Sequence, residues 1–203
     1  MIAKEIQKGI AHLSRNDKCL STLIKKIGKC NLQVRNNYFL ALLESIICQQ
    51  LSSKAADAIY KKFLIFFDNN PLPEKILNTD HSEIRKQGLS NSKVKYIKDL
   101  SEKIIKKEIN FKNIISKSDE EIISELTKVK GIGIWTVHMF LIFTLGRLNV
   151  LPTGDLGLKR AIKLNYKLKK IPNENKFIKI SRQNKWTPYS SIACWYLWKS
   201  LEL

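Results

Sequence analysis

The sequence is poor in acidic residues and contains no long hydrophobic run. Its 203 residues include 18 Asp and Glu against 36 Lys and Arg, which gives a formal net charge of +18. No uninterrupted apolar stretch approaches the roughly 18 residues that a membrane-spanning helix needs, so we expect a soluble protein. The excess of positive charge favours a polyanionic partner, with nucleic acid ahead of an anionic membrane surface. A compositional bias toward Lys, Ile and Asn would raise the charge in the same way, so the charge supports this prediction without deciding it.

Cysteine is scarce and no two cysteines form a C-x-x-C pair. The chain carries Cys19, Cys30, Cys48 and Cys194. Neither a zinc site nor an iron-sulfur cluster has its usual spacing, so we predict free, mostly buried thiols and no metal site made of side chains. The first 13 residues lack the continuous apolar core of a signal peptide. These features predict a reducing compartment, the cytoplasm or nucleoid, or the nucleus in a eukaryote.

Strand patterns are also lacking. Apolar residues recur with a period close to 3.6 in nearly every segment, which predicts an all-α fold. We expect helices at residues 1–13, 18–27, 38–50, 53–67, 73–77, 81–87, 91–107, 122–128, 136–145, 155–164, 174–184 and 188–201. Residues 1–203 are expected to form one functional unit with two helical lobes. A middle lobe would span roughly residues 36–115, and the N-terminal segment would join roughly residues 116–203 in the second.

Two glycines stand between two predicted helices, at Gly131 and Gly133. Glycine allows positive φ and lets the backbone approach a large ligand closely. The amides at the start of the next helix would then point at a phosphate, where the partial positive charge of a helix N-terminus favours an anion. An ordinary turn between two helices is the alternative, because G-x-G is common by chance.

The sequence KGIGIWT at residues 130–136, with NVLPTGDLGLKR at 149–160, resembles the helix-hairpin-helix and Gly/Pro-Asp signature of base-excision DNA glycosylases. Residues 46–56, 88–96 and 186–198 resemble blocks of the alkylated-base branch, DNA-3-methyladenine glycosylase II. The resemblance covers most of the chain from about residue 36. It implies two helical lobes with the active-site cleft between them. It also implies hydrolysis of the N-glycosidic bond of alkylated purines, of the 3-methyladenine and 7-methylguanine type, in duplex DNA, leaving an abasic site.

The same resemblance assigns the catalytic role to Asp155, which stands 20 positions after Trp135. Asp is also a preferred N-cap, and both roles are compatible because a helix N-terminus favours an ionised carboxylate. The carboxylate would stabilise an oxocarbenium-like sugar and guide or deprotonate the attacking water. Trp135 stands where lyase branches of the family carry a Schiff-base lysine, so no lyase activity is expected.

Other residues match the family's DNA-contacting positions. Trp135 and Trp198 would form the base pocket through stacking and cation–π attraction, with core packing as the alternative. Gln50 and Leu51 would fill the gap that a flipped base leaves in the stack, although Leu51 could equally be a core residue. The expected contacts to the DNA backbone are Gly131, Ile132, Gly133 and Thr136 in the hairpin, and Lys159 and Arg160 after the aspartate.

No cofactor is expected, except that hairpins of this family often hold a monovalent cation through backbone carbonyls. The expected partner is double-stranded DNA containing damaged bases. We expect a monomer without an obligate protein partner and without a membrane partner. Ser190 stands where family members often carry Arg. Two alternatives stay open: a glycosylase for an oxidised or mismatched base, and a non-catalytic helix-hairpin-helix DNA-binding protein.

Overall fold

The computed structural model describes residues 2–203, and every regular element in that range is a helix. The prediction of an all-α fold is confirmed. None of the helices in residues 2–203 has the length and apolar character needed to cross a membrane. The elements are α1 (Ile2–Asn16), α2 (Lys18–Ile27), α3 (Tyr38–Cys48), α4 (Ser53–Phe66), α5 (Pro73–Asn78), α6 (His81–Arg85), α7 (Asn91–Ile105), η1 (Ile114–Ser116), α8 (Asp119–Leu126), α9 (Ile134–Phe143), α10 (Leu156–Asn165), α11 (Glu174–Gln183), α12 (Ser190–Lys199) and η2 (Ser200–Glu202).

The helices form two compact units. Unit 1 comprises Met1–Val34 and Leu141–Leu203, and unit 2 comprises Arg35–Phe140. The predicted middle lobe ends near residue 115, whereas residues 116–140 belong to unit 2. Tertiary contacts place this segment in unit 2, because its glycine hairpin is hydrogen-bonded to Gln49 and Asp99 of the same unit.

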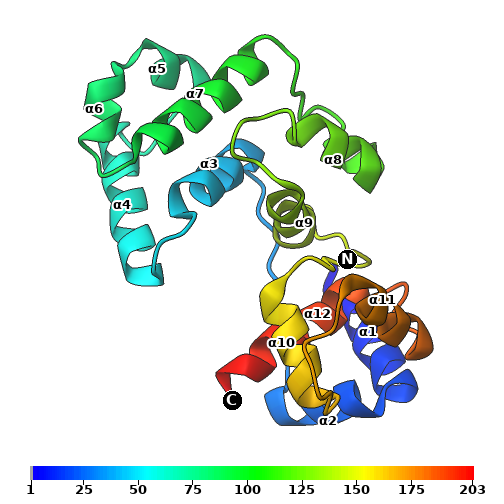
Figure 1. Ribbon diagram of the computed structural model, residues 1–203. Coiled ribbons are helices and arrows are strands. Elements are labelled where there is room, and N and C mark those ends of the chain that lie inside the picture. Colours follow the sequence, from blue (N-terminus) through cyan, green and yellow to red (C-terminus); the bar gives the residue numbers. More distant parts are fainter. Residues whose placement is uncertain (1) are drawn as a thin grey trace. The chain divides into compact units, whose positions relative to one another are not determined.

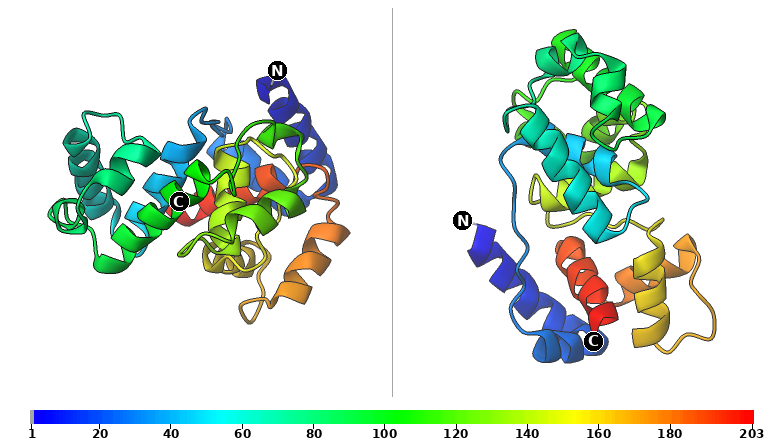
Figure 2. Two further views of the ribbon diagram at one scale, coloured as in Figure 1. Left: turned by 90° about the horizontal axis from the view of Figure 1, so that it is seen from above. Right: turned by 90° about the vertical axis from the view of Figure 1, so that its left-hand side faces the viewer.

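In unit 1 the two ends of the chain pack together, with the blue helices α1 and α2 beside the red helix α12 (Figures 1 and 2). A buried carboxylate, Asp17, strengthens this packing. It is 1% exposed, and its Oδ1 caps α2 by accepting from the N–H groups of Cys19 (2.9 Å) and Leu20 (3.0 Å). Its Oδ2 accepts from the Trp186 indole at 2.8 Å and from the Tyr166 hydroxyl. Asp17 therefore ties α2 to segments more than 140 residues away.

Unit 2 is organised around α7, which packs against α5, α3 and α6 (Figure 1). Ser90 caps α7 by accepting from the N–H of Lys93 at 3.3 Å. Ser118 and Glu121 form a capping box at the start of α8, and Ser52 caps α4. The buried side of α7 carries Val94, Ile97 and Leu100.

Candidate active site and nucleic-acid interface

Asp155 lies buried at the N-terminus of α10, with 7% of its surface exposed. Its Oδ1 accepts from the Leu158 N–H at 2.6 Å, so the predicted N-cap role is confirmed. The same oxygen accepts from the Trp198 indole N–H at 3.0 Å. Two donors on one oxygen fix the orientation of the carboxylate, and the helix N-terminus favours its negative charge.

Trp198, on α12, reaches this aspartate because Gly157 leaves room. A Cβ atom at Gly157 would lie 3.1 Å from Asp155 Oδ1 and 3.5 Å from Trp198 Cδ1. The indole also lies beside Phe143, whose ring centroid is 5.7 Å away. The resemblance predicts Trp198 as a stacking surface, and its hydrogen bond to Asp155 is visible only in the structure. That contact joins residues 43 positions apart and depends on the packing of α10 against α12.

The start of α12 holds the loop that leads to Asp155. Ser191 Oγ accepts from the Val150 N–H at 2.9 Å and donates to the Arg147 carbonyl at 2.7 Å. Ser190 is buried, and its Oγ donates to Asn149 Oδ1 at 2.8 Å. The serine that replaces the family's frequent arginine therefore supports this loop. The sequence drew attention to Ser190 but not to Ser191. A single serine carries no sequence signal for the hydrogen bonds that Ser191 makes to this loop.

The glycine hairpin, residues 127–133, lies in unit 2. Gly131 has φ +82, and a Cβ there would lie 2.2 Å from the Tyr96 ring, so only glycine fits without displacing that ring. Its carbonyl accepts from Gln49 Nε2 at 2.9 Å, and the Lys130 N–H donates to Asp99 Oδ2 at 2.9 Å. The hairpin is therefore held by side chains from two other segments of unit 2.

The outer edge of the hairpin leads into α9. A Cβ built at Gly133 would meet no atom within 4 Å, so the backbone is open to a large ligand at this point. Ile132 and Thr136 are buried, so the phosphate contacts predicted for them would come from their main chain. Trp135, in the first turn of α9, is 51% exposed, a value that core packing does not explain.

Gln50 and Leu51 lie in the loop between α3 and α4, also in unit 2. Gln50 is exposed with φ +56, and Leu51 is half-buried. The predicted residues thus divide between the units. The hairpin, Trp135, Gln50 and Leu51 lie in unit 2, and Asp155, Trp198, Lys159 and Arg160 lie in unit 1.

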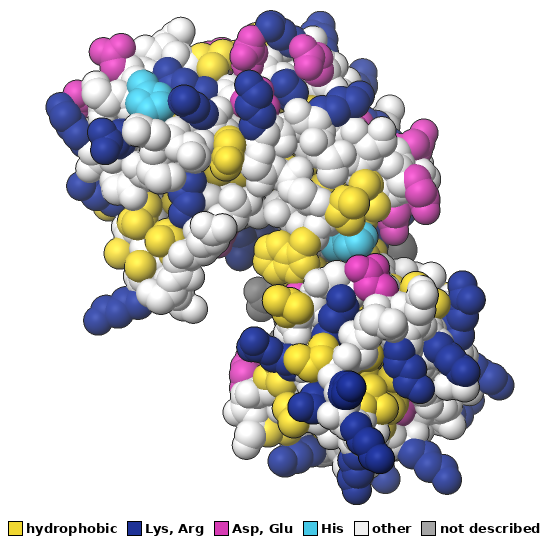
Figure 3. Space-filling model, in the orientation of Figure 1, with side chains coloured by type: hydrophobic (Ala, Val, Ile, Leu, Met, Phe, Trp, Pro, Cys, Tyr) yellow, Lys and Arg dark blue, Asp and Glu magenta, His cyan; other side chains and the backbone are white. Residues whose placement is uncertain are grey.

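The basic side chains are spread over both units on the face drawn in Figure 3. Lys159 is half-buried and Arg160 is exposed, both on α10 after Asp155. Lysines of α7 also bind backbone carbonyls within unit 2. Lys98 Nζ donates to the carbonyls of Leu77 (3.3 Å) and Thr79 (2.7 Å) at the end of α5. At least this lysine of α7 therefore caps the C-terminal end of α5 and is not free to contact DNA.

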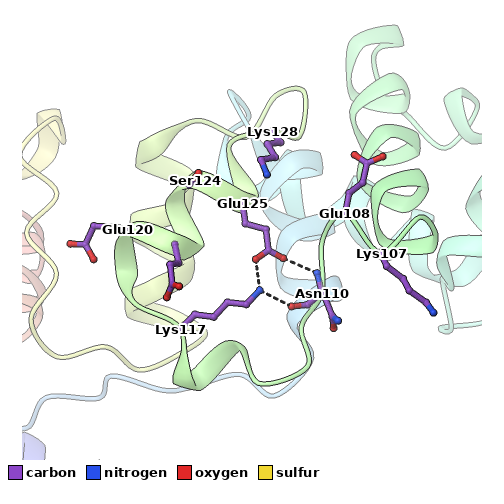
Figure 4. Close-up of a pocket in the computed structure, with 9 residues that line it drawn as sticks. Lys107, Glu108, Asn110, Lys117, Glu120, Ser124, Glu125 and Lys128 are labelled. Carbon is purple, nitrogen blue, oxygen red and sulfur yellow. Dashed lines mark hydrogen bonds and ion pairs between the residues drawn. The ribbon is translucent and has the colours of Figure 1, made fainter.

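A hollow in unit 2, between the end of α7 and α8, contains none of the predicted site residues (Figure 4). Glu125 forms an ion pair with Lys117 and accepts from the Asn110 N–H at 2.7 Å. Lys117 also donates to the Asn110 carbonyl at 3.2 Å. The charges that line the hollow are of both signs, and the Lys117–Glu125 pair anchors the loop before α8.

The described part of the chain, residues 2–203, holds no group of three or more His, Cys, Asp or Glu that could bind a metal ion. The four cysteines are free thiols, and Cys30 and Cys194 are buried. Burial raises the pKa of Cys30 to about 11, so this thiol is unreactive at neutral pH.

Comparison with known proteins places this geometry in a family. The model of the HhH-GPD superfamily base excision DNA repair protein matches residues 43–187. The chain is 36% identical over 194 residues to the alkylbase DNA glycosidase-like protein mag2 of Schizosaccharomyces pombe, covering 93% of this chain and 90% of that protein. It is 35% identical over 209 residues to DNA-3-methyladenine glycosylase 1 of the same organism, covering 100% of this chain and 90% of that protein.

A solved structure agrees with these relatives. The S. pombe 3-methyladenine DNA glycosylase Mag1, in complex with abasic DNA, superposes with a TM-score of 0.86 at 35% identity, covering 97% of each chain. The resemblance that the sequence motifs carry is confirmed. The chain belongs to the HhH-GPD superfamily of base excision DNA repair proteins.

Proposed function

We propose that this protein is a monofunctional DNA glycosylase that hydrolyses the N-glycosidic bond of alkylated purines in duplex DNA. The observation that carries the proposal is the buried Asp155 carboxylate, fixed by the Leu158 amide and the Trp198 indole. Such a group presents a preorganised negative charge, which electrostatic catalysis requires where positive charge develops. The relatives named DNA-3-methyladenine glycosylase support the alkylated-base substrate class.

The reaction follows from the charge of the substrate. A purine alkylated at N3 or N7 is already cationic, so the glycosidic bond breaks with its electron pair passing to the base, which leaves neutral. The sugar becomes oxocarbenium-like, and Asp155 stabilises it. Water then bonds to C1′ and its proton passes to the Asp155 carboxylate. No general acid is needed for the leaving group.

The product is an abasic site in an intact strand. Trp135 has no amine to form a Schiff base with the sugar, so the covalent route to strand cleavage is closed. We assign Trp135 and Trp198 to the base pocket and Gln50 and Leu51 to the wedge. The hairpin main chain, Lys159 and Arg160 contact the DNA backbone, and the enzyme acts as a monomer on double-stranded DNA.

A monovalent cation at the hairpin is part of the same proposal. Residues 127–133 line a surface hollow, and backbone carbonyl oxygens suit a hard cation. A higher melting temperature in NaCl or KCl than in tetramethylammonium chloride of equal ionic strength would support it. Equal melting temperatures would refute it.

The test is product analysis with the wild-type protein. Duplex DNA methylated with an alkylating agent is incubated with the enzyme, and free bases and strand breaks are measured before and after alkali. Release of methylated purine, with breaks only after alkali, is expected. Release only from duplexes with 8-oxoguanine or a mismatch would overturn the substrate class. No release from any duplex, with abasic DNA still bound, would favour the non-catalytic alternative.

A further inference from the structure

The end of α3 is held by a lysine of α7. Lys93 Nζ donates to the carbonyl oxygens of Ile47 at 2.8 Å and Gln49 at 2.7 Å. The Ile47 carbonyl belongs to the last turn of α3, whose carbonyls lack partners within the helix and attract a cation. Desolvation lowers the pKa of Lys93, as expected for an ammonium turned toward the protein.

This clamp acts on the wedge loop, residues 49–52. Gln50 has φ +56, a conformation that a residue with a Cβ atom rarely adopts. Lys93 fixes the Gln49 carbonyl on one side of it, and Ser52 caps α4 on the other by accepting from the Ala55 N–H. The loop that carries the proposed wedge residues is therefore fixed at both ends.

The same side of α7 holds the glycine hairpin. Lys93, Tyr96 and Asp99 recur every three residues, so they share one side of the helix. Tyr96 fills the space against Gly131, and Asp99 accepts from the Lys130 N–H.

Gln49 joins the two contacts. Its carbonyl is bound by Lys93, and its side-chain Nε2 donates to the Gly131 carbonyl at 2.9 Å. One glutamine thus links the wedge loop to the hairpin, and α7 supports both.

We propose that Lys93 is a positioning residue for base flipping. Together with Gln49 it keeps the wedge loop in register with the hairpin that grips the DNA backbone. The inference rests on the proposed function in taking Gln50 and Leu51 as the wedge. Unstacking a base costs energy that the inserted side chain must offset. A preordered wedge offsets more of it because less conformational entropy is lost on binding. Lys93 acts through the main chain and is not itself a phosphate ligand.

The test compares Lys93→Met, which keeps the apolar stem, with Lys95→Met, which removes the same charge from an exposed position on α7. The probes are a duplex with one tetrahydrofuran abasic analogue and the same duplex undamaged, each titrated at several salt concentrations. Lys93→Met should weaken binding to the abasic analogue on the order of tenfold, because two charge-assisted hydrogen bonds are lost. Its affinity for undamaged duplex and its salt slope should match those of Lys95→Met.

Two results would overturn the proposal. Equal weakening on both duplexes, with a salt slope about 0.9 smaller than that of Lys95→Met, would make Lys93 a direct phosphate contact. Unchanged binding to the abasic analogue would make the clamp dispensable. Should Lys93→Met fail to fold, Gln49→Leu must show the same selective loss, and equal loss on both duplexes would refute the link. The proposed function is tested by base release, whereas this inference is tested by binding to an abasic analogue. The two can therefore fail independently of each other.

Discussion

Replacing Trp198 with Phe separates the hydrogen bond of this residue from its stacking surface. The indole Nε1 donates to Asp155 Oδ1 at 3.0 Å, and the Leu158 N–H donates to the same oxygen at 2.6 Å. Phe keeps an aromatic ring on α12 beside Phe143 but offers no donor. The substitution therefore removes the Trp198 donor from the carboxylate and leaves the Leu158 amide bond in place.

The expected loss follows from the strength of that bond. A hydrogen bond to an ionised group contributes about 1.5–3 kcal/mol, and each 1.4 kcal/mol changes a rate about tenfold. The single-turnover rate of base release should therefore fall about 10- to 100-fold. Affinity for lesion-containing duplex should change much less, because the aromatic face remains. Trp198→Ala should lose about 1–3 kcal/mol of binding in addition, since the stacking surface also goes.

The assay is single-turnover release of methylated purine with enzyme in excess, combined with equilibrium binding. Trp195→Phe is the matched control, because Trp195 lies on the same helix and packs edge-on against Tyr196. The control should keep the wild-type rate. Wild-type turnover by Trp198→Phe, or a loss confined to binding, would refute the positioning role of the indole N–H.

Three further predictions concern the supports of the site. Gly131→Ala should lower the melting temperature and weaken DNA binding, because a side chain at φ +82 costs about 1–2 kcal/mol and meets the Tyr96 ring. Unchanged DNA binding would argue against a contact between the hairpin and the DNA backbone. Asp17→Ala should reduce the free energy of unfolding, measured in urea, by about 3–5 kcal/mol, because the cap of α2 and the acceptor of the Trp186 indole are lost. A loss below about 1 kcal/mol would contradict the structural role of Asp17. Burial lowers the pKa of His138 from 6.5, so the unfolded state binds more protons and stability should fall as pH drops below about 6.5. His138→Gln should flatten that decline in urea titrations at several pH values, and an identical pH profile would exclude His138 as its source.

Local signals predicted the parts of the fold that depend on neighbouring residues. The 3.6-residue period predicted the helices, and Asp155 was correctly identified as a cap because capping involves residues two or three positions away. The boundary near residue 115 differs from that of unit 2, because residues 116–140 join unit 2 through contacts with segments far away in the sequence.

In the candidate site, too, the sequence predicted individual residues but not the contacts between distant segments. Asp155 and Trp198 were identified by resemblance, but the hydrogen bond between them was not, since its donor lies on a different helix. Lys93 is one of several lysines of α7, and only the structure places its ammonium on the carbonyls of Ile47 and Gln49. Long, flexible side chains give no sequence signal for such partners.

Base release by Asp155→Asn, compared with the wild type on methylated duplex DNA, tests the central claim most directly. Asn is as good an N-cap as Asp and keeps an oxygen that can accept from Leu158 and Trp198, so the variant should fold and bind DNA like the wild type. Asp80→Asn is the control, because Asp80 precedes α6 without a side-chain capping bond. The account predicts that turnover by Asp155→Asn falls by on the order of 10²–10³ or more, while the control is unaffected. Release at the wild-type rate by Asp155→Asn would contradict it.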